Sequence, residues 1–149
     1  MAFHFTLEVV LRFRQSLEES ERLRLQGLLA RRVAMLQELE QARQTSSNLQ
    51  EETKRAMLQQ PTPAIEIHFV AARLKGLECW QQLMREELLK LEAAIAEQRL
   101  RFEQERRQRE VLEALRDAQL GNYRLMQRRL EQARLDEMHL LRRGHSSQA

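Results

Sequence analysis

The side chains that could do chemistry are scattered along this sequence and form no catalytic motif. The four histidines stand at positions 4, 68, 139 and 145, and the single cysteine is Cys79. Asp136 and His139 are three residues apart, on one face of a helix, but two ligands rarely make a metal site. No base stands near Cys79 in the sequence, and no glycine-rich phosphate loop is present. We therefore expect no enzymatic activity, no metal, no cofactor and no small-molecule substrate.

The composition indicates few, long helices in place of a compact globular core. Charged residues make up 32% of the chain and aromatic residues only 5%, and there are four Gly and two Pro to interrupt regular structure. Ala, Glu, Leu, Arg and Gln dominate, and all five are strong helix formers. This composition is typical of an all-α coiled coil.

One strong break divides the chain into two helical segments. Pro61 cannot continue a helix that arrives from before it, whereas Thr62 can cap a new helix with Pro63 at its first position. We predict one helix over about 6–58, a turn at 59–64, a second helix over about 65–143, and a disordered tail at 144–149 that begins at Gly144. The stretch 45–48 is rich in weak helix formers, but we predict that the first helix continues through it.

Apolar residues recur every seven residues in the second segment, as in a coiled-coil seam. One series runs Val70, Leu77, Met84, Leu91, Gln98, Glu105, Leu112, Gln119, Met126, Ala133 and Leu140, and the other runs Leu74, Gln81, Leu88, Ile95, Phe102, Arg109, Arg116, Tyr123, Leu130 and Glu137. The first segment has a less regular stripe, which predicts imperfect supercoiling. That stripe comprises Leu7, Val10 or Leu11, Leu17, Leu25, Leu28, Val33, Leu36, Leu39, Ala42 and Leu49.

The unequal lengths of the two segments predict an overhang. A hairpin that folds at residue 61 pairs residue i roughly with residue 123 minus i, so Leu7 faces about Arg116. Residues 117–143 then lack an intramolecular partner, although they carry apolar side chains, namely Leu120, Tyr123, Met126, Leu130 and Leu135. A helix with an apolar stripe needs a partner, which is either another protein or a second copy of the chain.

Charge and hydropathy narrow the classes of partner. The 25 basic and 22 acidic residues are finely mixed, as on a solvated helical surface. Nucleic-acid binding through Arg99, Arg101, Arg106, Arg107 and Arg109 is an alternative, but carboxylates stand among these arginines and no aromatic residues interleave to stack bases. Neither a transmembrane segment nor a secretory signal is evident, so we expect a cytoplasmic protein, in agreement with its lone cysteine.

Both ends of the chain resemble one family. The segment Phe5-Thr6-Leu7-Glu8-Val9-Val10-Leu11-Arg12-Phe13-Arg14 is similar to the amino-terminal signature of FliJ, the coiled-coil component of the bacterial flagellar export apparatus. Leu115, Tyr123 and the run Glu131-Gln132-Ala133-Arg134-Leu135-Asp136-Glu137 resemble that family's carboxy-terminal helix. The equivalent protein of virulence type III secretion systems is similar in shape, and a self-assembling scaffold is a further alternative.

The resemblance implies a stalk that binds and activates the hexameric export ATPase, associated peripherally with the inner membrane. It also implies contacts with the cytoplasmic domain of the export gate membrane protein and with export chaperones. The residues that it implies for the ATPase end are Phe5, Leu7, Val10, Leu11, Arg14, Leu115, Tyr123, Leu130, Glu131, Leu135, Asp136 and Glu137. For the turn end we expect Leu49, Ile65 and Phe69 to contact a partner.

Overall fold

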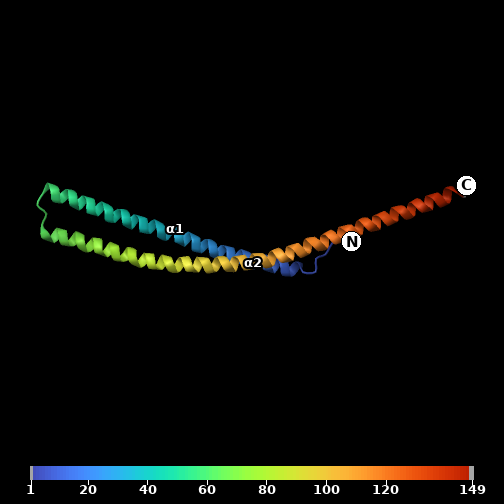
Figure 1. The fold of residues 1–149 in the computed structure, drawn as a ribbon, viewed down its shortest axis with the longest axis horizontal. Coiled ribbons are helices and arrows are strands. Elements are labelled where there is room, and N and C mark those ends of the chain that lie inside the picture. Colours follow the sequence, from blue (N-terminus) through green and yellow to red (C-terminus); the bar gives the residue numbers. More distant parts are fainter. Residues whose placement is uncertain (1, 148–149) are drawn as a thin grey trace. The chain divides into compact units, whose positions relative to one another are not determined.

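The computed structural model describes residues 2–147, which form two long helices packed against each other as a helical hairpin (Figure 1). Helix α1 runs from Glu8 to Gln59, and α2 runs from Ala64 to Ser146. The described residues contain no strand. The predicted all-α hairpin is confirmed.

Helix α1 is continuous, as predicted. It begins where the backbone N–H of Glu8 donates a hydrogen bond to the carbonyl of Phe5 at 3.2 Å. It passes unbroken through residues 45–48, where the Thr45 hydroxyl donates to the carbonyl of Gln41 at 2.9 Å. Back-bonding of this kind satisfies a hydroxyl inside a helix without breaking the backbone ladder.

The turn forms at the two prolines, but Thr62 does not act as the predicted cap. Its hydroxyl donates to the carbonyl of Gln60 at 3.4 Å, away from the new helix. The carbonyl of Pro63 instead accepts the backbone N–H groups of Glu66 and Ile67, at 3.1 and 3.3 Å. The fixed φ of Pro63 therefore starts α2 without a side-chain cap.

The predicted stop at Gly144 is wrong, because α2 continues through this glycine to Ser146. No glycine among the described residues has a positive φ, so Gly144 does not adopt the left-handed conformation that ends many helices. The predicted disordered tail is therefore helical at 144–146. Its last two residues, 148 and 149, lie outside the described part.

The heptad register predicted for α2 coincides with its buried face. Every position of the two series from Val70 to Tyr123 is buried or half-buried, including the polar Gln81 and Gln98. The remaining positions, from Met126 to Leu140, are all exposed. The pattern thus continues beyond the point where its intramolecular partner ends.

Helix α1 follows a strict heptad, in contrast with the less regular stripe predicted for it. Its heptad positions, all buried or half-buried, are Leu11, Arg14, Glu18, Glu21, Leu25, Leu28, Arg32, Met35, Leu39, Ala42, Ser46, Leu49 and Thr53. Val33 and Leu36, which we expected on this face, are 55% and 42% exposed, and Met35 is buried in their place. Counting only apolar residues hid the register, because several of its positions are polar.

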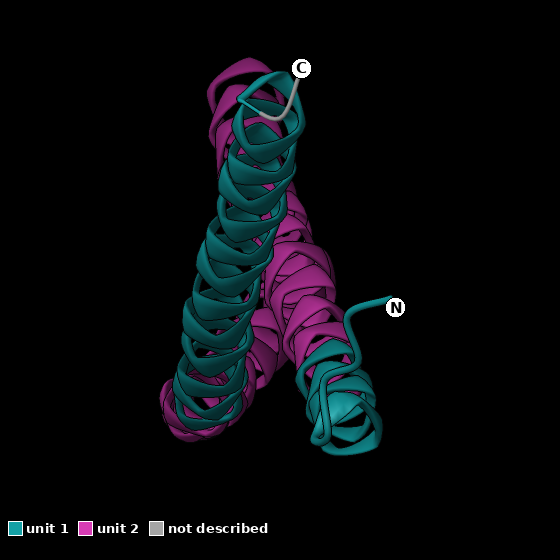
Figure 2. Ribbon diagram, turned by 90° about the vertical axis from the view of Figure 1, so that its right-hand side faces the viewer, with its two compact units in different colours: residues 1–19, 104–149 teal, residues 20–103 magenta. Residues whose placement is uncertain are grey.

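The hairpin comprises two compact units, coloured separately in Figure 2. Unit 2, residues 20–103, contains the apolar core, in which Met35, Leu91 and Ile95 are buried. Leu25, Leu28, Leu29, Met84 and Leu88 pack around them. Unit 1 combines residues 1–19 with residues 104–149, and its described part contains the predicted ATPase end.

Within each unit the observed pairs follow the predicted register to within about one helical turn. In unit 2, Arg32 lies 3.5 Å from Glu92, close to position 91 that the pairing rule gives. In unit 1, Glu18 pairs with Arg109, one turn beyond the predicted position 105.

Candidate partner-binding surface

The amino-terminal segment of unit 1, residues 2–7, is not helical and packs along α2. Phe5 is 4% exposed, and Leu11, in the first turn of α1, is completely buried. The ring of Phe3 stacks at a tilt on Tyr123, with centroids 5.6 Å apart. Phe5 and Leu11 are therefore core residues of this unit, and the expectation that their side chains contact a partner is wrong for this conformation.

This segment also shortens the predicted overhang. Gln119, Leu120, Tyr123 and Gln127 are half-buried, whereas every residue from 128 to 147 is exposed. This non-helical segment continues along α2 as far as Tyr123, so the chain covers more of α2 than the pairing rule assumed. The uncovered part begins after Gln127, not at residue 117.

Ion pairs accompany the buried apolar residues across the seam of unit 1. Arg109 pairs with Glu18 across the seam and with Glu113 on its own helix, the latter at 2.6 Å. The hydrogen bond to Glu18 raises the pKa of Arg109, and the bond to Glu113 adds to the rise. Arg14, predicted to bind a partner, lies 3.5 Å from Glu105 and is thus engaged within the unit.

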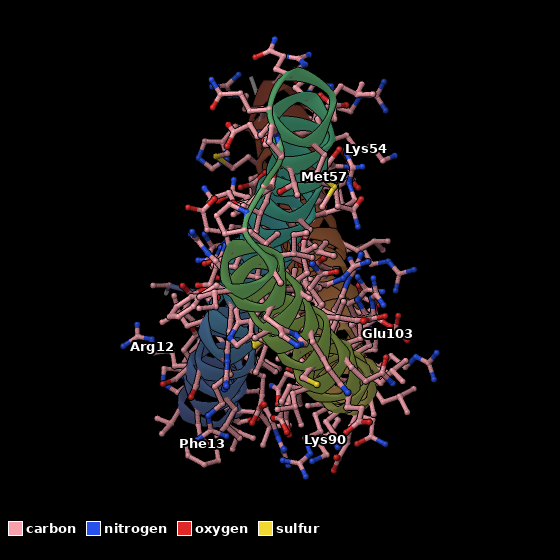
Figure 3. All side chains as sticks on the ribbon, turned by 90° about the vertical axis from the view of Figure 1, so that its left-hand side faces the viewer. Arg12, Phe13, Lys54, Met57, Lys90 and Glu103 are labelled. Carbon is pink, nitrogen blue, oxygen red and sulfur yellow. The ribbon has the colours of Figure 1, made fainter. Side chains whose placement is uncertain are left out.

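Beside these ion pairs, unit 1 carries a shallow apolar groove. It is lined by Val10, Arg14, Arg107, Gln108, Val111 and Leu112. Of the residues that we expected to meet a partner, Val10 and Leu115 are partly exposed and Leu7 is half-buried. Phe13, which the prediction did not include, projects from the outside of α1 (Figure 3).

From Met126 onward the heptad positions of α2 are exposed. We call Met126, Leu130, Ala133, Glu137 and Leu140 the overhang face, because they continue the two series that are buried up to Tyr123. Leu130 is 53% exposed and Leu140 is 70% exposed. Leu141, which sequence reasoning missed, flanks this face and is also exposed.

Leu135 does not belong to the overhang face, although we predicted it there. It follows Leu130 by five residues, which places the two side chains about 140° apart around a helix. Leu135 lies instead beside Met138 on the opposite side. Glu131 and Asp136 are exposed, and Asp136 accepts a hydrogen bond from Gln132 at 3.1 Å.

The turn end of unit 2 exposes a second group of apolar side chains. Ile65 and Phe69 are 75% and 79% exposed, in keeping with an accessible surface, whereas Leu49 is half-buried in a small groove with Thr53, Ile67 and Val70. Met57 projects from α1 near Lys54 (Figure 3), and Leu58 is also exposed. Sequence reasoning missed both, although the break that follows them at Pro61 was a signal that no helix covers them.

The described residues hold no metal-binding cluster, and two of the arginines considered for nucleic-acid binding are paired with carboxylates. No cluster of three or more His, Cys, Asp or Glu side chains within residues 2–147 could hold a metal, and Asp136 and His139 gain no third ligand there. Arg101 and Arg106 are paired with Glu97 and Glu110 at 2.6 and 3.0 Å. Because carboxylates already form ion pairs with these two arginines, the arrangement disfavours phosphate binding.

No family model, curated protein or solved structure matches this chain. Within residues 2–147, neither helix contains a segment that is both long enough and apolar enough to span a lipid bilayer.

Proposed function

We propose that the chain is a non-enzymatic coiled-coil component of the bacterial flagellar protein export apparatus, which binds the hexameric export ATPase as a stalk and activates it. The observation that supports this proposal is the overhang face. A heptad register that is buried up to Tyr123 continues on α2 as a face that no element of residues 2–147 covers, and an exposed apolar register of this kind is typical of a partner-binding helix. The terminal segments that resemble the FliJ family belong to this same unit.

The turn end gives the proposed stalk a second contact. Ile65 and Phe69 expose apolar surface there, which suits an interaction with the cytoplasmic domain of the export gate or with export chaperones. The protein would then associate peripherally with the inner membrane at the export apparatus. A virulence type III secretion system has an equivalent stalk, and the same surfaces would serve it.

A matched pair of substitutions tests the ATPase contact. Leu130 and Leu135 are 53% and 56% exposed, carry the same side chain and lie on different sides of α2. We expect Leu130→Asp to abolish stimulation of the export ATPase, because it places a charge in the centre of the overhang face. Leu135→Asp makes the same chemical change away from that face and should retain stimulation.

Deletion of residues 128–149 gives a second test of the same contact. The covered seam ends at Gln127, so the truncated chain should keep its helical hairpin and its unfolding transition but lose stimulation of the ATPase. Circular dichroism checks the fold, and ATP hydrolysis by the purified export ATPase checks the function. Normal stimulation by both the deletion and Leu130→Asp would refute the proposed contact.

A further inference from the structure

The two flanks of the overhang face carry charges whose order matters. In a heptad seam, the residue before each position of the Tyr123 series forms one flank, which here contains Asn122, Arg129, Asp136 and Arg143. The residue after each position of the Met126 series forms the other flank. That flank contains Leu120, Gln127, Arg134 and Leu141.

We propose that the overhang face binds the same face of a second copy of this chain, in antiparallel orientation, with Leu130 of each copy opposite Ala133 of the other. In a two-fold symmetric pair each contact occurs twice. In antiparallel helices each flank faces the same flank of the other copy. Arg129 then lies opposite Asp136 of the second copy, and Asp136 lies opposite its Arg129. The two helices attract each other at both ends of the central layer.

The apolar positions agree with this register. Tyr123 comes opposite Leu140 in the outer layers, and on the second flank Leu120 comes opposite Leu141. The paired segment spans residues 120–143, which at about 1.5 Å per residue is roughly 36 Å and more than three heptads. Leu120 and Tyr123 are half-buried by their own chain and Leu140 and Leu141 are exposed, so a second copy would cover mainly the uncovered end of each helix.

Repulsion between like charges disfavours the registers that are shifted by one heptad. Sliding one copy by a heptad in one direction places Arg129 opposite Arg129, and sliding it in the other places Asp136 opposite Asp136. A parallel pair places Glu137 against Glu137 inside the seam and Arg129 against Arg134 on its edge. Like charges in these positions disfavour association, so the antiparallel register that we propose is the complementary one.

Arg129 is also available for such a contact. Within the described residues no ion pair engages it, in contrast with Arg109 in the covered part of the same unit. The hydrogen bond from Gln132 to Asp136 occupies one carboxylate oxygen and leaves the other open. This inference does not depend on the proposed function, because it concerns the chain alone. Both use the overhang face, so a second copy and the ATPase would compete for it.

Charge reversal tests the pairing in the full-length protein. We expect sedimentation velocity over a concentration series at low salt to show a monomer–dimer equilibrium. Arg129→Asp and Asp136→Arg should each weaken dimerisation by on the order of tenfold, because each replaces two attractive pairs by two repulsive ones. The double variant should restore it. Residues 129 and 136 are seven apart on one helix, too far to contact each other, so rescue requires two chains.

Matched controls complete the experiment. Arg128→Asp makes the same charge change on the outward side of α2 and should leave dimerisation unchanged. Glu137→Leu replaces the one charged residue in the seam, opposite Met126, and should tighten the dimer, because a polar seam residue costs stability. A monomer at every concentration overturns the proposal. So does failure of the double variant to restore association, or tighter association of Arg129→Asp, which a parallel pair predicts.

Discussion

Units 1 and 2 share one heptad geometry but differ in the balance of interactions that join their helices. An apolar cluster dominates in unit 2, whereas ion pairs accompany the buried Phe5 and Leu11 in unit 1. In unit 2 the seam centres on buried Met35, Leu91 and Ile95. In unit 1, Arg109 connects Glu18 and Glu113 across the equivalent positions. The register alone thus sets which residues face each other, and the chemistry at those positions sets how strongly they are held. Apolar burial is insensitive to salt, whereas partly exposed ion pairs are screened by it.

The difference matters for the proposed function. Unit 2 has the contacts expected of a persistent support, while unit 1 presents uncovered surface next to a seam that salt can weaken. Elements that bind partners are commonly drawn from the less stable parts of a fold. The following predictions test whether the two units differ in this way.

The largest effect is expected from Ile95→Ala in unit 2. Ile95 is 4% exposed within the apolar core, so truncation should cost about 2–5 kcal/mol of unfolding free energy through lost burial and a residual cavity. Leu89→Ala is the control on the same helix, since Leu89 is 67% exposed and should cost less than about 0.5 kcal/mol. Urea denaturation followed by circular dichroism measures both. Equal losses would remove the distinction between seam and surface.

A smaller, salt-dependent effect is expected from Arg109→Met in unit 1. The Arg109 side chain is 22% exposed, and its removal leaves Glu18 and Glu113 without their shared cation. We expect a loss of roughly 1–2 kcal/mol at low salt that shrinks near 1 M salt, where screening acts within about 3 Å. Hydrogen exchange of unit 1 amides measures this local stability. A loss that is independent of salt would contradict an ionic seam.

This contribution should not vary with pH around neutrality. The pKa of Arg109 is raised in the folded state, so its stabilising effect is complete below the unfolded-state pKa and disappears only as the pH rises through the folded-state value. Both values lie far above neutral. The difference in stability between the native chain and Arg109→Met should therefore be constant between about pH 6 and 9. A marked slope in this range would implicate another group.

Packing of the amino-terminal segment on α2 should contribute less to stability than the ion pairs of Arg109. Phe3→Ala removes the ring contact with Tyr123, and tilted aromatic pairs contribute about 0.5–1.5 kcal/mol beyond their buried area. We expect faster hydrogen exchange at the start of α1 and a change in Tyr123 fluorescence, with unit 2 unaffected. Phe13→Ala is the matched control, because Phe13 is 59% exposed. Equal effects of the two changes would show that the segment is not held by this contact.

The smallest effect on stability is expected from Glu40→Gln in unit 2, on the solvent side of α1. Hydrogen bonds from Arg43, at 3.0 and 2.8 Å, hold the pKa of Glu40 below its ordinary value of 4.5. A lowered pKa stabilises the fold above the unfolded-state value, and this contribution is lost as the pH falls through the folded-state value. Glu40→Gln should leave the helicity at neutral pH unchanged and slightly flatten its decline in acid. A clear loss at neutral pH would indicate a larger role.

The hairpin, its turn and the buried face of α2 were determined by the sequence itself. Two prolines and a seven-residue repeat are local signals, and a repeat kept over many heptads leaves one face to bury. The face of α1 was predicted only in part, through apolar residues such as Leu25, Leu28 and Ala42. Its heptad positions include Arg14, Glu18 and Arg32, which read as surface residues until the opposite helix supplies their counter-charges.

The extent of the uncovered surface was decided by tertiary structure. Heptad repeats in α2 look the same before and after Tyr123, so only the position of the other chain segment separates covered from free residues. Residues 2–7 reach Tyr123 as a non-helical segment in which Phe5 is buried and Phe3 packs on Tyr123. Sequence periodicity specifies which face of a helix seeks a partner. The path of the rest of the chain determines how much of that face remains available to one.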